Sequence, residues 1–159
     1  MSTLNELVND FLAQKHIAVV GLSRTTPNAA NLIYDKLKKG PYTVYAVNPQ
    51  TERIAGDPCY PNVAALPQRP DGVVIVTRPD ITEQVVKECA AAGITRVWIH
   101  QSLMHGATSV SPTAVEYCRT HGITVIAGGC PMMFAQPVDF GHKCMKWLMG
   151  ITGQLPVPA

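Results

Sequence analysis

The sequence predicts an α/β fold, a single Rossmann-like domain in which a doubly wound, five-stranded parallel sheet carries helices on both faces. Short apolar segments alternate along the chain with amphipathic ones, and only a few residues connect each pair. The apolar segments also lack a polar face, which is typical of strands buried on both sides. We expect the strands at residues 17–20, 42–47, 73–77, 97–100 and 123–127.

Composition limits the class of protein before any motif is considered. The 159 residues are 47% hydrophobic and 15% charged, which favours one ordered domain over residues 1–159. A net charge of +2 without a stripe of Lys or Arg gives no reason to expect nucleic acid. No apolar run reaches the roughly 18 residues of a membrane span, and polar residues interrupt the N-terminal segment, so we expect neither membrane nor signal peptide. Five cysteines without a C-x-x-C pair suggest reduced thiols and a cytoplasmic protein.

The first two helices follow from periodicity and capping signals. Apolar residues at helical spacing predict an N-terminal helix over about residues 3–14, capped by Ser2 or Thr3. A second helix should start near Pro27, with Thr25 or Thr26 as its cap, because proline is tolerated in the first helical turn.

The later helices carry comparable signals. Asp80 and Glu83 have the spacing of a capping box, Ser111 precedes a proline at a helix start, and Gly93 and Gly122 are typical helix stops. A C-terminal helix is expected over about residues 139–150. Its apolar residues include Trp147, Leu148 and Met149, which predicts that either the core or a homodimer partner covers them.

A candidate anion site follows the first strand. In doubly wound sheets, ligands bind at the carboxyl ends of the strands. Here Gly21 ends a strand just before a helix, so backbone N–H groups and the helix dipole should point at one spot. Ser23 and Arg24 add a hydroxyl and a positive charge, which favours a phosphate. The dinucleotide motif G-x-G-x-x-G has three glycines and this turn has one, so an ordinary strand-to-helix turn is the alternative.

Residues at the other strand ends narrow the choice of ligand. Arg78 follows the third strand, and guanidinium groups match phosphate oxygens in pairs. An NAD site carries an acidic residue after its second strand, where this chain has Asn48 and Pro49. The pattern therefore disfavours NAD and leaves NADP open.

Catalytic and metal-binding patterns are sparse. The chain has no G-x-S-x-G turn, no paired carboxylates at strand ends, and no histidines and cysteines at metal-ligand spacing. We therefore expect no catalytic residue and no metal site. Cys130, after the fifth strand, is either a reactive thiol or a packed, inert one.

Together these segments resemble a known family. The motifs are I-A-V-V-G-L-S-R at 17–24, V-N-P at 47–49, V-T-R-P at 76–79, V-W-I-H-Q at 97–101, G-G-C-P at 128–131 and P-V-D-F-G-H-K-C at 137–144. They are similar to the small stand-alone CoA-binding proteins and to the N-terminal CoA-binding domain of the succinyl-CoA synthetase α subunit. The synthetase's phosphorylated histidine belongs to a second domain that these motifs do not include, so the resemblance implies no catalysis.

The resemblance implies a protein that binds coenzyme A or an acyl-CoA without chemistry of its own. Two alternatives stay open at this point: an NADP-binding, oxidoreductase-like protein, and a thiol or CoA-disulfide redox protein that uses Cys130. The residues expected to contact the ligand are Gly21, Ser23, Arg24, Asn48, Pro49, Thr77, Arg78, Pro79, His100 and Gln101.

Overall fold

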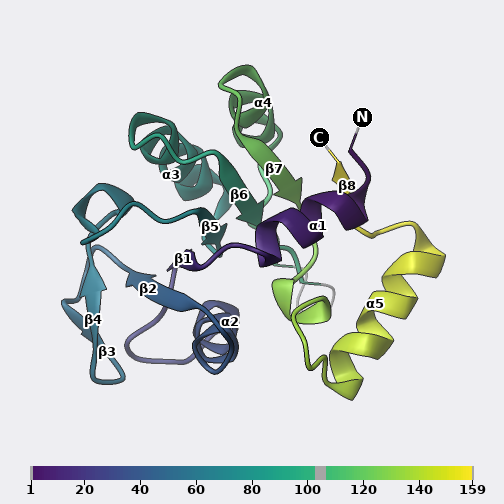
Figure 1. Ribbon diagram of the computed structural model, residues 1–159, viewed down its shortest axis with the longest axis horizontal. Coiled ribbons are helices and arrows are strands. Elements are labelled where there is room, and N and C mark those ends of the chain that lie inside the picture. The colour runs from purple at the N-terminus through teal and green to yellow at the C-terminus, as the bar shows by residue number, and fades with distance from the viewer. Residues whose placement is uncertain (1, 103–106, 159) are drawn as a thin grey trace.

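The computed structural model describes residues 2–102 and 107–158 and shows an α/β fold built on one mixed, mostly parallel sheet (Figure 1). Its strands lie in the order β3-β4-β2-β1-β5-β6-β7-β8. Five parallel strands form the centre, namely β2 (Thr43–Val47), β1 (His16–Val20), β5 (Gly72–Ile75), β6 (Arg96–Ile99) and β7 (Thr124–Ala127). The predicted parallel core is therefore confirmed.

The expected number of five strands is wrong, because the sheet is extended at both edges. On one side β4 (Asp57–Tyr60) pairs with β2 in parallel, and β3 (Arg53–Ile54) pairs with β4 antiparallel. On the other side β8 (Val157–Pro158) pairs with β7 antiparallel. The hairpin between β3 and β4 turns at Ala55 and Gly56, which both have positive φ. Strands of two to four residues are too short to show a period in the sequence, and Ala55 is an unusual turn residue.

Helices cover both faces of the sheet. On one face lie α1 (Leu4–Leu12), α2 (Ala29–Lys38), the short 3₁₀ helix η2 (Pro131–Met133) and α5 (Phe140–Thr152). On the other lie α3 (Pro79–Ala91), α4 (Pro112–Thr120) and the 3₁₀ helix η1 (Val63–Ala65). Side chains along β1 alternate between the two core layers, so the strand needs apolar residues at every position.

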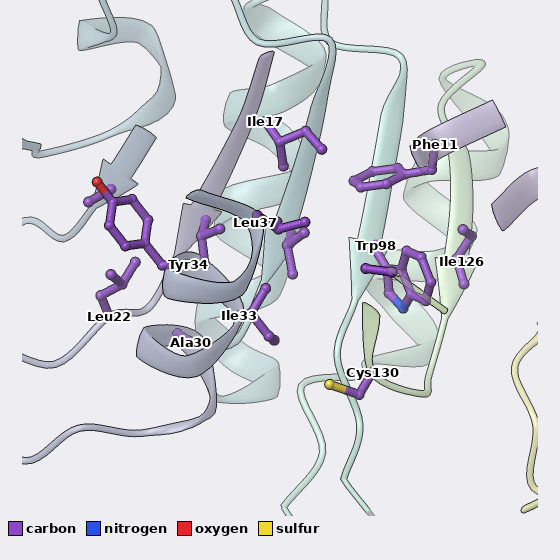
Figure 2. Close-up of a cluster of buried hydrophobic side chains, with 14 of the residues drawn as sticks. Phe11, Ile17, Leu22, Ala30, Ile33, Tyr34, Leu37, Trp98, Ile126 and Cys130 are labelled. Carbon is purple, nitrogen blue, oxygen red and sulfur yellow. The ribbon is translucent and has the colours of Figure 1, made fainter. Parts of the chain in front are cut away.

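Trp98 is the largest fully buried side chain and anchors the first core layer (Figure 2). The ring of Phe11, from α1, meets it edge to face with centroids 5.6 Å apart. The indole Nε1 of Trp98 donates a hydrogen bond of 3.0 Å to the Gly128 carbonyl oxygen. Gly72 leaves room for Phe11, because a Cβ there would lie 2.7 Å from that ring. Helix α1, strand β6 and the turn after β7 therefore meet at this indole.

Helix starts differ from the expected ones at two places. Helix α2 is capped by Asn28 rather than by Thr25 or Thr26, and the side chain of Asn31 completes a capping box. Helix α3 starts at Pro79 after Arg78, which makes no side-chain cap, so Asp80 lies inside the helix instead of capping it. Helices α1 and α4 are capped by Thr3 and Ser111.

Helix α5 is bounded by Asp139, whose side chain accepts from the His142 N–H, and by Gly153 in the left-handed conformation. Met149 is buried, whereas Phe140 is 81% exposed and Trp147 is 68% exposed. Within this chain the core therefore covers Met149 but not the aromatic residues of the helix. Among the described residues no helix is long and apolar enough to cross a membrane.

Candidate functional site

A cleft of about 1320 Å³ lies at the carboxyl ends of the central strands. The chain leaves β1 toward β2 on one side, and β5 continues to β6 on the other, so β1 and β5 form the topological switch point. Pockets for small ligands are usually about 300–1,000 Å³, so this one suits a large or elongated molecule.

Gly21 brings the backbone close at the switch point. Its φ is +107°, and a Cβ at this position would lie 1.9 Å from the Val76 carbonyl oxygen. The Gly21 N–H donates to the Val47 carbonyl oxygen at 3.2 Å. The first turn of the site therefore needs glycine both for its backbone conformation and for its contact with β5.

Two asparagines hold the loop of residues 22–28 in place. The Asn31 Oδ1 accepts from the Ser23 N–H at 3.0 Å and from the Asn28 N–H at 3.2 Å, and the Asn31 Nδ2 donates to the Ser23 carbonyl oxygen. The Asn28 Nδ2 donates to the Gly21 carbonyl oxygen at 3.0 Å. The Ser23 hydroxyl accepts from the N–H groups of two loop threonines. Ser23 therefore shapes the loop rather than facing the cleft.

Three helix N-termini meet at the cleft. Ala29 of α2, Pro79 of α3 and Gly141 of α5 all line it. First-turn amides of a helix have no intrahelical acceptor, and the dipole adds positive potential there. The positive ends of three helix dipoles therefore lie at one cleft, which favours an anionic group there.

Arg78 is the basic side chain among the described lining residues. It is 77% exposed, and its Nη2 donates to the Asp80 Oδ2 at 2.8 Å. This hydrogen bond lowers the pKa of Asp80. An exposed pair of this kind contributes little to stability, so a phosphate can take the place of the Asp80 carboxylate at small cost. Next to it the Thr77 hydroxyl is 2.8 Å from the Thr82 hydroxyl and thus partnered within α3.

The opposite end of the cleft, toward β7 and α5, collects titratable side chains. His142 Nδ1 lies 2.6 Å from the Asp139 Oδ2, and both residues line the cleft. His100 at the end of β6 is 4% exposed; burial, and then the charge of His142, lower its pKa to about 4. Burial raises the pKa of the Cys130 thiol to about 11. Cys130 is therefore protonated at neutral pH, which argues against the reactive-thiol interpretation.

The structure brings half of the expected contact residues to the cleft. Gly21, Thr77, Arg78, Pro79 and His100 line it. The others, Ser23, Arg24, Asn48, Pro49 and Gln101, are not among its lining residues. Asn48 supports the first turn instead, since its Nδ2 donates to the Leu22 carbonyl oxygen.

Several residues that line the cleft do not directly follow a strand, so the sequence offered no reason to expect them there. They are mainly helix residues, including Asn28, Leu32, Ile81, Met132, Asp139, His142 and Met145. The pair Asn28 and Asn31 has capping spacing that the sequence does show. In the parts of the chain that the structure covers, no group of three or more His, Cys, Asp or Glu side chains could hold a metal ion.

Fold and site together define an α/β protein with an elongated, anion-favouring cleft at the switch point of its sheet. Residues 15–136 match the family described as CoA binding domain, and the chain belongs to that family. The resemblance to CoA-binding domains is thereby confirmed.

The chain is also similar to proteins of known sequence or structure. The chain is 30% identical over 121 residues to acetate–CoA ligase [ADP-forming] I of Archaeoglobus fulgidus, covering 73% of this chain and 18% of the ligase. A hypothetical protein from Pyrococcus horikoshii superimposes with a TM-score of 0.75 at 25% identity, over 87% of this chain and 96% of that one. The dinucleotide-forming acetyl-coenzyme A synthetase 1 of Ca. Korarchaeum cryptofilum gives a TM-score of 0.57 at 25% identity, over 69% and 25%. The chain thus spans less than a fifth of the curated ligase it matches.

Proposed function

We propose that this protein binds coenzyme A or an acyl-CoA in the cleft and has no chemistry of its own. The convergence of three helix N-termini on one elongated cleft is the observation that carries the proposal. Membership of the CoA binding domain family supports coenzyme A as the occupant. The described residues suit this ligand, because the first turns of α2 and α3 line the cleft and Arg78 supplies a cation there.

The shape of the cleft suggests how the ligand lies. The diphosphate would sit at the N-termini of α2 and α3, above the ends of β1 and β5. From β1 to β7 is three strand spacings, roughly 14 Å. The pantetheine arm of coenzyme A has about twelve chain bonds, or some four residue lengths, which also extends to roughly 14 Å. The thiol would therefore reach the end of the cleft next to α5.

The adenosine part would lie on the β2 side, outside the lining described above. Asn48 and Pro49 follow β2, and Arg24 is exposed on the loop after β1. We assign Arg24 to the 3′-phosphate, because that group lies at the adenosine end of the ligand and needs an exposed cation. Gln101, which pairs with Thr108 beside β6, would border the pantetheine arm.

Isothermal titration calorimetry with CoA, dephospho-CoA, NAD and NADP tests this proposal. We expect CoA to bind and NAD not to bind, with dephospho-CoA weaker than CoA. Binding of NADP without binding of CoA would instead support the oxidoreductase-like alternative and reject the proposal.

Two arginine variants separate the phosphate contacts. Loss of a charge-assisted hydrogen bond costs about 1.5–3 kcal/mol, or roughly 10- to 150-fold in Kd. Arg78→Ala should weaken CoA and dephospho-CoA alike, because it acts on the diphosphate. Arg24→Ala should weaken CoA and leave dephospho-CoA unchanged. Equal effects of Arg24→Ala on both ligands would place the 3′-phosphate elsewhere.

A further inference from the structure

The pair Asp139 and His142 has a geometry that simple helix capping does not require. Asp139 caps α5 through its Oδ1, which accepts the His142 backbone N–H at 3.0 Å. Its other oxygen, Oδ2, lies 2.6 Å from the Nδ1 of the His142 ring. One carboxylate therefore fixes both the helix start and the orientation of an imidazole in the cleft.

The proton positions in this pair follow from chemistry. Hydrogen bonds from His142, first from its backbone and then from its side chain, lower the pKa of Asp139, so its carboxylate is ionised and can only accept. Nδ1 of His142 must then carry the proton. In the neutral ring Nε2 has a free lone pair that can accept a proton, and the Asp139 carboxylate on Nδ1 fixes the ring's tautomer and orientation.

His100 supplies a second, independent observation at the same place. His100 is 4% exposed and lines the cleft. It also interacts electrostatically with His142. Because burial keeps the His100 ring neutral at pH 7, it adds no positive charge beside His142.

We propose that His142, oriented by Asp139, accepts the thiol proton of bound coenzyme A, so that the cleft prefers free CoA to acyl-CoA. This inference rests on the proposed function and names which form of the ligand is recognised. The proton leaves the ligand sulfur for Nε2 of His142, and no other bond changes. The product is a thiolate beside an imidazolium ion, which the Asp139 carboxylate stabilises on its other side.

The selectivity follows from the ligand's chemistry. A thioester sulfur carries no proton, so an acyl-CoA cannot make the interaction and leaves Nε2 without its partner. Cys130, which also lines this end, stays a neutral thiol and does not compete for the proton. A hydrogen bond to a charged group has a typical effect of about 10-fold or more on affinity.

Calorimetry with CoA and acetyl-CoA tests the inference on wild type, His142→Gln and Asp139→Asn. We expect wild type to bind CoA about 10-fold more tightly than acetyl-CoA, and His142→Gln to reduce the ratio to about one. Asp139→Asn keeps a helix cap but loses the anion, so its ratio should fall between the two. His121→Gln is the matched control, because His121 lies on the exposed end of α4 and is not among the cleft residues.

Ultraviolet absorbance of the ligand thiolate gives a second readout that a purely structural role would not change. The thiol pKa of bound CoA should lie at least one unit below that of free CoA in wild type and His121→Gln, and return to the free value in His142→Gln. If CoA binds normally but acetyl-CoA binds equally well and the thiol pKa is unchanged, this inference is rejected and the proposed function stands. If CoA does not bind at all, the proposed function fails first.

Discussion

Replacing Gly21 with alanine tests whether the switch point is built on a close backbone contact. The added Cβ would lie 1.9 Å from the Val76 carbonyl oxygen and 2.8 Å from the Val76 carbonyl carbon. Both are main-chain atoms of Val76, which directly follows β5, so no side-chain rotation relieves the overlap. The ends of β1 and β5 must move apart, at the place where the Val76 N–H donates to the Val20 carbonyl oxygen at 2.9 Å.

Two terms contribute to the expected loss of stability. A positive φ of +107° costs alanine about 1–3 kcal/mol. Disrupting one or two hydrogen bonds between strands adds about 1–2 kcal/mol. We therefore expect Gly21→Ala to reduce the free energy of unfolding by about 2–5 kcal/mol, a large part of the roughly 5–15 kcal/mol of a typical domain.

Urea denaturation followed by circular dichroism measures this loss, with Gly56→Ala as the control. Gly56 also has a positive φ, +87°, but a Cβ there meets no described heavy atom within 4 Å. Gly56→Ala should therefore show the conformational term alone, about 1–3 kcal/mol. Equal losses in the two variants would refute the argument from close approach.

Three further predictions concern the core and the titratable groups. Trp98→Phe removes the hydrogen bond to the Gly128 carbonyl oxygen and leaves a cavity, so it should cost about 2–4 kcal/mol in urea denaturation, whereas Trp147→Phe on the exposed face of α5 should change stability by less than about 0.5 kcal/mol. Because burial lowers the pKa of His100 to about 4 in the folded protein, the unfolded chain binds more protons between about pH 6.5 and 4. Unfolding free energy should therefore fall by on the order of 3 kcal/mol as pH falls through that range, and His100→Gln should flatten the profile; an unchanged profile would mean that His100 is not buried. In thiol titration at neutral pH, the exposed Cys144 should react rapidly and the buried Cys130 slowly; rapid labelling that persists in Cys144→Ser would contradict the burial of Cys130.

The sequence predicts the centre of this fold well, because strong and redundant signals act there. Buried parallel strands need apolar residues at every position, as in β1 and β5, and such runs are recognisable without a structure. The edges are different. The hairpin of β3 and β4 has short strands and turns at Ala55, whose positive φ no propensity rule predicts.

The site shows the same division. Residues that directly follow strands, such as Gly21, Arg78 and His100, are predictable because parallel strands end at one edge. His142 could not be placed in this way, because it lies on α5, whose path over the end of the sheet is a matter of tertiary packing. Arg24 and Asn48 follow strands as well, yet local hydrogen bonds and loop direction keep them out of the cleft lining. Position along a strand therefore predicts nearness to the site but not the direction of a side chain.

A crystal structure of the protein with coenzyme A tests the central proposal most directly. We predict electron density for the diphosphate at the N-termini of α2 and α3, and for the sulfur at the other end of the cleft, beside His142. Density for the ligand elsewhere on the surface, or a cleft that stays empty at saturating CoA, would contradict the account.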